Sequence, residues 1–407
     1  MTRFGAFVLL VLLIIVGGVG YLTWNNWSIL TGIAPLVRPA PELQAGEPLP
    51  FTLSPGFTAR IYASSTPGAR VLALDPRGVI VASLTSEGKV VALPDENGDG
   101  VADTTVEVIT GLNKPHGIVF RCDENNPEVC RLFIAEEDVV QSYTYDPTSR
   151  KASLPKTLMS LPSDGGHSTR SLHIMPDNKK ILVAVGSSCN VCNEENALRA
   201  AISMMDPETG EHSIYAKGLR NTVFMTINPI DGSLWGTDMG RDLLGDDTPP
   251  DEVNIIEEGK NYGWPICYGG NIHDTQFNPD GNATRSNGAG KNTPCASFQA
   301  SHIDIPAHAA PLGLVFIPEE GWPEDYWHDL LVAYHGSWNR SVPTGYKIVR
   351  IELDTRGNPT GEVEDFMTGF TRDGEVIGRP VGLLVQPGGT LYVSDDRASV
   401  IYKITRN

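Results

Sequence analysis

The sequence predicts an all-β fold made of six similar antiparallel sheets, and three observations support this prediction. The 407 residues include 42 glycines and 30 prolines, about 18 % of the chain. In average sequences the two residues together reach roughly 12 %. Because both residues mark turns and are costly inside helices, we expect many short strands rather than long helices. The hydrophobic share of 41 % is enough for a packed core and excludes global disorder. The third observation is an internal repeat.

The repeat consists of an apolar run, a turn rich in proline, aspartate and glycine, and a second apolar run. Six copies begin near residues 71, 117, 171, 222, 312 and 381, and several are followed by a third strand-like segment. One such unit cannot bury both faces of its sheet, whereas six units packed radially can do so around a central channel. We therefore predict a six-bladed β-propeller over residues 51–407.

Two segments of this propeller fall outside the repeat. Residues 58–62 alternate in polarity and have no nearby partner, so we expect them to pair with the last blade and close the ring. Residues from about 265 to 311 form an insertion that is rich in Asn, Gly and His and is spanned by Cys267 and Cys295. We expect this insertion to lie as a loop over one mouth of the channel.

The N-terminal segment predicts a membrane anchor. Residues 4–22 carry no charge, and as a helix they would extend about 28 Å, close to the thickness of a bilayer core. We predict a transmembrane anchor helix within residues 1–30 and a Pro-rich linker over residues 31–50. A cleaved signal peptide is the alternative. Both interpretations export the propeller, and the anchor predicts a single-pass protein of the inner membrane with its propeller in the periplasm.

The six cysteines support export. They form three pairs that are close in the sequence, which is typical of disulfides in an oxidising compartment. The predicted disulfides are Cys122–Cys130, Cys189–Cys192 and Cys267–Cys295. The second pair has CxxC spacing, so a redox or metal site is its alternative, although the chain has no second CxxC.

The charge balance narrows the function classes. The chain has 31 basic and 49 acidic residues, a net charge of −18, which argues against binding to nucleic acid. The acidic surplus either provides solubility or builds sites for divalent cations.

Two acidic segments are candidates for such sites. Residues 237–254 hold a dense group of carboxylates among Gly and Pro, and a solvated loop is the alternative. The second segment, residues 95–106, is similar to the first half of a calcium-binding loop, but Val106 stands at the twelfth position, where a glutamate is expected. Its candidate ligands for a structural calcium ion are Asp95, Asn97, Asp99 and Asp103.

Five polar clusters adjoin the apolar runs and are expected to line one mouth of the channel. They occupy residues 114–117, 165–170, 218–221, 335–340 and 378–380. A single His or Arg beside a strand is usually structural, but recurrence at equivalent blade positions favours a functional site. An imidazole can accept a proton from a hydroxyl group, and several guanidinium groups together can hold a polyanion.

These clusters resemble a known family, the soluble-type PQQ-dependent sugar dehydrogenases, and in particular their sorbosone dehydrogenase-like branch. The resemblance covers most of residues 57–405 and rests on five segments taken together. They are GHSTRSL at 166–172, VGSSCNVC at 185–192, GLRN at 218–221, DEVN at 251–254 with YGWP at 262–265, and HGSWNR at 335–340. The family implies a six-bladed propeller that holds pyrroloquinoline quinone (PQQ) and a calcium ion at the channel mouth.

The resemblance also implies roles for individual residues. His167 would be the general base that takes the substrate's hydroxyl proton, and Arg220 with Asn221 would contact the quinone and stabilise its reduced form. The main-chain carbonyls of Gly240 and Arg241 would coordinate calcium, although the family's glucose-oxidising members have a Gly-Pro segment there. Residues implied to pair with the cofactor's carboxylates are Arg340, Lys347 and Arg379. His116 and Arg170, from the same polar clusters, are further cofactor-binding candidates.

The activity implied is oxidation of an aldose sugar or an aldehyde, sorbosone-like substrates included. The electron acceptor would be a quinone or a cytochrome near the membrane. Two functions of other classes are the alternatives: a calcium-dependent hydrolase of the lactonase type, and a membrane-tethered binding propeller without catalysis. A lactonase needs carboxylates from several blades in its channel, whereas the candidates here are mainly Arg and His.

Overall fold

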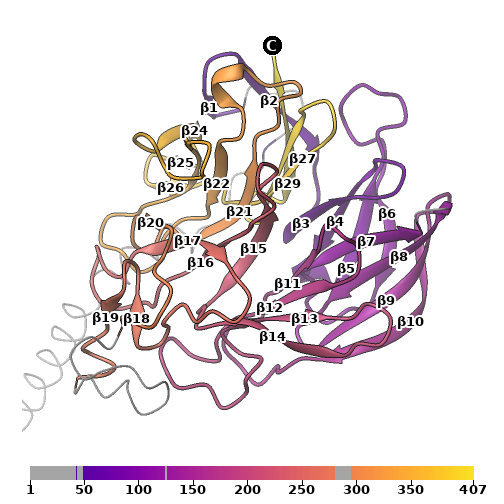
Figure 1. Ribbon diagram of the computed structural model, residues 1–407. Coiled ribbons are helices and arrows are strands. Elements are labelled where there is room, and N and C mark those ends of the chain that lie inside the picture. The colour runs from indigo at the N-terminus through magenta and orange to yellow at the C-terminus, as the bar shows by residue number, and fades with distance from the viewer. Residues whose placement is uncertain (1–42, 44–48, 124–125, 280–294) are drawn as a thin grey trace, which may run out of the picture.

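The computed structural model describes residue 43 and residues 49–123, 126–279 and 295–407 (Figure 1). Within these ranges the regular structure is almost entirely β, and the two helices are the short 3-10 helices η1 (Thr85–Glu87) and η2 (Glu324–Tyr326). Six antiparallel sheets of at least four strands account for most of it, and each forms one blade. The prediction of an all-β, six-bladed propeller is therefore confirmed.

The first three blades, each given from its inner to its outer strand, use consecutive strands of the chain. They are β3 (Ala69–Leu74), β4 (Ile80–Leu84), β5 (Lys89–Leu93) and β6 (Val106–Thr110); β7 (Ile118–Asp123), β8 (Asn126–Ala135), β9 (Val139–Asp146) and β10 (Lys151–Ser160); and β11 (Arg170–Ile174), β12 (Ile181–Val185), β13 (Ala201–Met205) and β14 (His212–Lys217).

The last three blades have additional segments. Their strands are β15 (Thr222–Ile227), β16 (Leu234–Asp238), β17 (Asp251–Ile256) and β20 (Ile303–Ile305); β21 (Pro311–Phe316), β22 (Leu330–Tyr334), β23 (Lys347–Ile351), β24 (Glu364–Thr368) and β1 (Thr52–Leu53); and β27 (Pro380–Val385), β28 (Leu391–Asp395), β29 (Val400–Arg406) and β2 (Phe57–Ala63). Two small hairpins lie outside the blades, β18 (Cys267–Tyr268) with β19 (Ile272–His273), and β25 (Thr371–Arg372) with β26 (Glu375–Val376).

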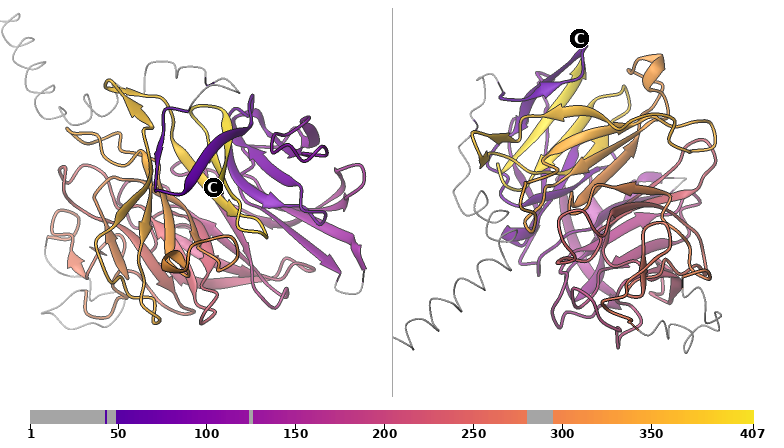
Figure 2. Two further views of the ribbon diagram at one scale, coloured as in Figure 1. Left: turned by 90° about the horizontal axis from the view of Figure 1, so that it is seen from above. Right: turned by 90° about the vertical axis from the view of Figure 1, so that its left-hand side faces the viewer.

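The ring is closed by strands from both ends of the chain. The N-terminal strand β2 pairs antiparallel with β29, in a register that sets Thr58 opposite Thr405 (Figure 2). Each inner strand contacts the inner strands of the two neighbouring blades, so the inner strands form a complete ring. The predicted pairing of residues 58–62 with the last blade is confirmed.

The core lies between neighbouring sheets. The second strands of five blades, namely β4, β12, β16, β22 and β28, are buried along their whole length. For example, Trp235 of β16 is fully buried, and its ring lies edge-on to that of Phe316 of β21, with 5.3 Å between centroids. Because such contacts join different blades, each sheet depends on its neighbours to bury its apolar faces.

All three predicted disulfides are present: Cys122–Cys130, Cys189–Cys192 and Cys267–Cys295. The first joins directly opposed residues of β7 and β8. The third lies in the segment between β17 and β20, which corresponds to the predicted insertion. Residues 303–305, which we expected within that insertion, form the outer strand β20 of the fourth blade and pair with β17.

The predicted anchor helix, residues 1–30, lies outside the described residues, as does nearly all of the predicted linker, residues 31–50. Among the described residues, no helix has the length and apolar character needed to cross a bilayer.

Candidate functional site

A polar cavity opens at the end of the channel where the inner strands begin. The volume of this cavity is about 630 Å³, which includes the solvent-filled space at its open mouth. Its charged and polar lining comes mainly from residues that precede inner strands or follow second strands, namely His167, Arg220, Asp242, His308, His335, Asn339 and Arg379, and also from Asp251 at the start of the third strand β17. Four of the five predicted polar clusters therefore meet here, and only that of residues 114–117 contributes no lining residue.

His167 lies in the loop that leads into β11. Its Nδ1 is 3.0 Å from the carbonyl oxygen of Ser187 and 3.1 Å from the Ser187 hydroxyl. Because a carbonyl can only accept, Nδ1 carries the proton, and Nε2 is the nitrogen available to a ligand. Burial, followed by the positive charge of Arg220, lowers the pKa of His167 to about 4. The imidazole is therefore neutral near pH 7 and can accept a proton.

Close packing of glycine backbone fixes the His167 loop. Gly166 has a left-handed φ of +71°, and a Cβ atom there would lie 2.3 Å from the Ser187 carbonyl oxygen. A Cβ on Gly186 would lie 2.7 Å from the Cβ of His167. Both positions therefore require glycine for the His167 loop to approach the end of β12.

Arg220 precedes β15 and is buried, with 4 % of its surface exposed. Its Nε donates to the Asn190 carbonyl, Nη1 donates to the Gly240 and Met239 carbonyls, and Nη2 donates to Asn190 Oδ1 and Asp242 Oδ2. These bonds use all five N–H donors of the guanidinium group. Arg220 is thus a fixed positive charge in the wall of the cavity.

A second imidazole, His335, follows β22; it lies in a predicted polar cluster but had no role assigned to it. Its Nε2 lies 2.9 Å from Asp396 Oδ1, and Arg70 pairs with the other oxygen of Asp396 at 2.6 Å. Burial, followed by Arg379, lowers the pKa of His335 to about 4, against the opposing charge of Asp396. Burial disfavours an Asp396 anion, but His335 and Arg70 hold the pKa of Asp396 well below its usual range. His335 is therefore a neutral imidazole oriented by a carboxylate.

Arg379 precedes β27 on the same side of the cavity as His335. Its Nε donates to the His335 carbonyl at 3.0 Å, and Nη2 donates to the Gly336 carbonyl at 2.5 Å. Within the described part of the chain, these two bonds leave other N–H donors of the positively charged guanidinium group at the cavity.

The remaining wall is rich in oxygen atoms. Asp242 accepts from Arg220 and from Asn339, and Asn339 also lies 3.4 Å from Nδ1 of His308. The carboxyl of Asp251 accepts from the backbone N–H groups of Gly240 and Ala310, and burial raises its pKa to about 7. The Gly240 carbonyl accepts from Arg220 at 2.8 Å.

The structure does not bring four predicted cofactor ligands to the cavity. His116 is fully buried, with Nδ1 3.1 Å from the Arg170 carbonyl. Arg170 uses its guanidinium group to bind backbone carbonyls, including that of His167, and so supports the loop rather than a ligand. Arg340 pairs with Asp247, and Lys347 pairs with Asp365 on the neighbouring strand β24.

Asn221 occupies an intermediate position. It does not line the cavity, but its Nδ2 lies 3.6 Å from Sδ of Met239, which does. Its buried Oδ1 has no hydrogen-bond partner in the described part of the chain.

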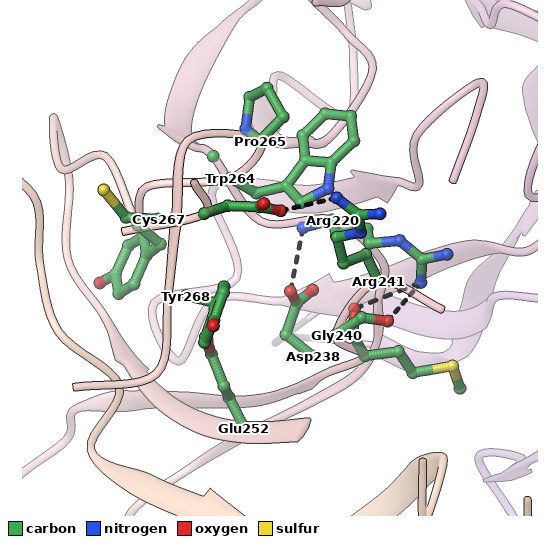
Figure 3. A pocket seen from close by; sticks show the side chains of 13 residues that line it. Arg220, Asp238, Gly240, Arg241, Glu252, Trp264, Pro265, Cys267 and Tyr268 are labelled. Atoms are coloured by element: carbon green, nitrogen blue, oxygen red, sulfur yellow. Dashed lines mark hydrogen bonds and ion pairs between the residues drawn. The ribbon is translucent and has the colours of Figure 1, made fainter. Parts of the chain in front are cut away.

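The predicted calcium ligands fall in two places. Gly240 lines the polar cavity, and both Gly240 and Arg241 line a smaller neighbouring cavity of about 330 Å³. Figure 3 shows Arg220 and Arg241 close together above Asp238 and Gly240 in this second space. Asp238 lines this second cavity, and its carboxyl group is buried. Burial, followed by the charge of Glu252, raises the pKa of Asp238 to about 8.

The second predicted calcium loop is compact but lies away from the cavity. Asn97 Nδ2 donates to Asp103 at 2.7 Å and to Asp99 at 3.2 Å, and the Gly100 N–H donates to Asp95 at 2.9 Å. A structural calcium ion at Asp95, Asn97, Asp99 and Asp103 stays a prediction.

The CxxC pair is not a thiolate site. Within the described ranges, one group of three His, Cys, Asp or Glu side chains has its ligand atoms within 4.8 Å of one another, namely Cys189, Cys192 and Glu194. The two sulfur atoms are bonded to each other, so neither is available as a thiolate.

Five site residues had weak sequence signals or none. His335, Trp338 and Asn339 lie in the HGSWNR segment, from which we had selected only the arginine. His308 lies between β20 and β21, at the end of the predicted insertion, and was not among the polar clusters that we predicted. Asp396 pairs with His335 across 61 positions of sequence, and no local pattern points to that contact.

Comparison with known proteins agrees with this architecture. A family model described as TrAA12-like matches residues 51–407. The chain is 26 % identical over 418 residues to a pyrroloquinoline quinone-dependent pyranose dehydrogenase of Coprinopsis cinerea, covering 89 % of this chain and 56 % of that protein. It is 23 % identical over 425 residues to a pyrroloquinoline quinone-dependent sugar dehydrogenase of Hypocrea jecorina, covering 90 % and 91 %.

An uncharacterised protein of Borreliella burgdorferi is 35 % identical over 240 residues, which cover 58 % of this chain and 60 % of that protein. The chain thus spans between 56 % and 60 % of the length of these two relatives, from Coprinopsis and Borreliella.

Solved structures show the same fold. The Trichoderma reesei AA12 enzyme superposes with a TM-score of 0.74 at 21 % identity, covering 90 % of this chain and 100 % of that one. The holo form of the pyranose dehydrogenase PQQ domain from Coprinopsis cinerea superposes with a TM-score of 0.72 at 23 % identity, covering 90 % and 98 %. Because the family model matches the whole span of the propeller, this chain belongs to the TrAA12-like family.

Proposed function

We propose that this chain is a PQQ- and calcium-dependent dehydrogenase that oxidises an aldose sugar or an aldehyde. The observation that carries the proposal is the pairing of a neutral imidazole, His167, with a fixed positive charge, Arg220, in one polar cavity. The names of two relatives, a pyranose and a sugar dehydrogenase that depend on this quinone, support the choice of cofactor and substrate class.

The cavity fits such a cofactor. The quinone carries carboxylates, and Arg379 offers N–H donors that no described residue of the chain uses. Trp338 adds an aromatic ring to the lining, which suits a planar ligand.

The same cavity has a wall that fits calcium. The carbonyl of Gly240 and the carboxylate of Asp242 are hard oxygen donors at the cavity, and the backbone of Arg241 adjoins them. Calcium prefers carboxylate and carbonyl oxygens of this kind. Since the Gly240 carbonyl accepts one hydrogen bond from Arg220, its second lone pair is left for a cation.

When bound, the quinone supplies a hydride acceptor and the calcium ion polarises it. The chain's own residues provide the acid–base chemistry. Nε2 of His167 accepts the proton of the substrate hydroxyl, while Nδ1–H stays on the Ser187 carbonyl and fixes the ring. Arg220 stabilises the negative charge that develops beside it, and it needs no reorganisation because its own bonds hold it in place.

The location of the enzyme follows from the same proposal. Three disulfides support an oxidising compartment, and an anchor within residues 1–30 would hold the propeller at the periplasmic face of the inner membrane. There it would pass electrons to a quinone or a cytochrome.

The test uses the full-length chain in detergent, loaded with PQQ and calcium. Reduction of an artificial electron acceptor is followed with aldoses, pyranoses, simple aldehydes and sorbosone. We expect turnover that requires both the quinone and calcium. Failure of the chain to bind the quinone would overturn the proposal, and binding without turnover of any substrate would instead support a non-catalytic propeller.

A further inference from the structure

The loop between β12 and β13 contacts both residues that the proposed function places at the chemistry. The relevant part comprises residues 187–192 and ends in the Cys189–Cys192 disulfide. Although this part of the loop contributes no lining residue to the polar cavity, its atoms bind His167 on one side and Arg220 on the other.

On the first side, Ser187 holds His167. The Ser187 carbonyl accepts from the His167 backbone N–H at 3.0 Å and from its ring Nδ1 at 3.0 Å. The Ser187 N–H in turn donates to the Arg220 carbonyl at 2.8 Å. Ser187 is fully buried, so water cannot replace these bonds at low cost.

On the second side, Asn190 holds Arg220. Its carbonyl and its Oδ1 accept from Nε and Nη2 of Arg220, both at 3.0 Å. The Asn190 side chain also binds the backbone of Asp242 twice, accepting from N–H at 2.7 Å and donating to the carbonyl at 3.0 Å. Asn190 thus joins the guanidinium group to the oxygen-rich wall of the cavity.

The disulfide explains how a loop can fix two side chains from different blades. Asn190 lies inside the small ring that Cys189 and Cys192 close, so few backbone conformations are open to it. The Ser187 hydroxyl donates to the Cys189 carbonyl at 2.7 Å, which attaches the same ring to the residue that holds His167. Glu194 anchors the loop from outside by accepting from Ser188 N–H and Oγ, both at 2.7 Å.

We propose that Ser187 and Asn190, constrained by the Cys189–Cys192 disulfide, are positioning residues that set the orientation of His167 and Arg220. The role in catalysis rests on the proposed function, whereas the effect on His167 itself does not. The proposed function and the positioning role of Ser187 and Asn190 can therefore be tested separately.

The first experiment measures the pKa of His167 by NMR titration of the cofactor-free, full-length chain. The variants are Asn190→Ala, which keeps the disulfide, and the double variant Cys189→Ser/Cys192→Ser. The matched control is Cys122→Ser/Cys130→Ser, which removes a disulfide from the hairpin of β7 and β8. The groups that lower the His167 pKa beside burial are Arg220, Arg170 and Arg199.

We expect the wild type and the control to keep a low His167 pKa, near 4. In both loop variants the pKa should rise by at least one unit, because a loosened loop admits water and lets Arg220 move away. An unchanged pKa in both loop variants would overturn the proposal, whatever the activity of the loaded enzyme.

The second experiment separates kcat from KM in the loaded enzyme. Asn190→Ala and the Cys189→Ser/Cys192→Ser variant should lose about ten- to a hundredfold in kcat with little change in KM, since they misplace reacting groups rather than substrate contacts. A loss equal to that of Asn190→Ala in the Cys122→Ser/Cys130→Ser control would show a general effect of destabilisation and contradict the positioning role.

Discussion

The two ends of the central channel are lined by opposite kinds of side chain. At the end where the inner strands begin, the cavity is lined by residues such as His167, Arg220 and Arg379. At the other end, a space of about 1060 Å³ is lined by the inner strands themselves, mostly through apolar residues such as Val119, Leu314 and Leu384. The strands therefore build the channel, and the residues that lead into them provide its chemistry.

Two histidines make this comparison direct. His167 precedes β11 and lines the polar cavity, whereas His173, within β11, lines the apolar end. Burial lowers the pKa of both to about 4. A depressed pKa alone therefore does not mark a catalytic histidine, and the difference lies in what each ring faces.

The largest expected effect is on the first of these two histidines. His167→Gln should lower kcat of the loaded enzyme by about a hundred- to ten-thousandfold, the usual contribution of a general base. His173→Gln is the matched control and should keep kcat within about threefold, because its ring faces the apolar end of the channel. Steady-state kinetics with an artificial acceptor measure both, and similar losses in the two variants would remove the distinction between the ends.

The next prediction concerns the charge of the polar end. Arg379→Ala should weaken binding of the quinone by about ten- to a hundredfold, since it removes hydrogen bonds from a charged donor. Lys347→Ala is the control: its side chain pairs with Asp365 between β23 and β24, so we expect no measurable change. Calorimetric titration of the calcium-loaded chain with the quinone measures both affinities. An equal loss in the lysine variant would restore the role that the family resemblance implied for Lys347.

Arg379 and Lys347 also show how much of the site can be predicted from the sequence. The apolar repeat predicted the six inner strands, because a blade must place such runs at regular intervals. Polar clusters before those strands predicted His167, Arg220 and Arg379, because the start of every inner strand lies at the same mouth. The family resemblance also implied cofactor binding by Lys347, which begins the third strand of its blade and pairs with Asp365 instead of lining the cavity. It implied the same role for Arg340, which pairs with Asp247 through a contact that strand periodicity does not encode.

Contacts between distant loops account for the residues that were missed. The orientation of His335 depends on Asp396 and, through it, on Arg70, which come from opposite ends of the chain. His308 reaches the cavity from the segment that joins β20 to the inner strand β21, at the end of the predicted insertion. Such contacts depend on ring closure and on individual loop paths, so a single sequence without its fold gives no local signal for them.

The smallest expected effect is on stability at the apolar end, and it follows from the low pKa of His173. The folded-state pKa of about 4 lies below the usual histidine value near 6.5, so on acidification the unfolded chain binds this proton first. The contribution of His173 to stability is therefore present above about pH 6.5 and is lost as the pH falls toward 4. Relative to His173→Gln, the wild type should lose about 1.4 kcal/mol of unfolding free energy for each pH unit in that range. Denaturant titrations of both proteins at several pH values measure this difference. If the unfolding free energies of the two proteins change equally with pH, water reaches the His173 ring. The apolar end would then be more open than the structure indicates.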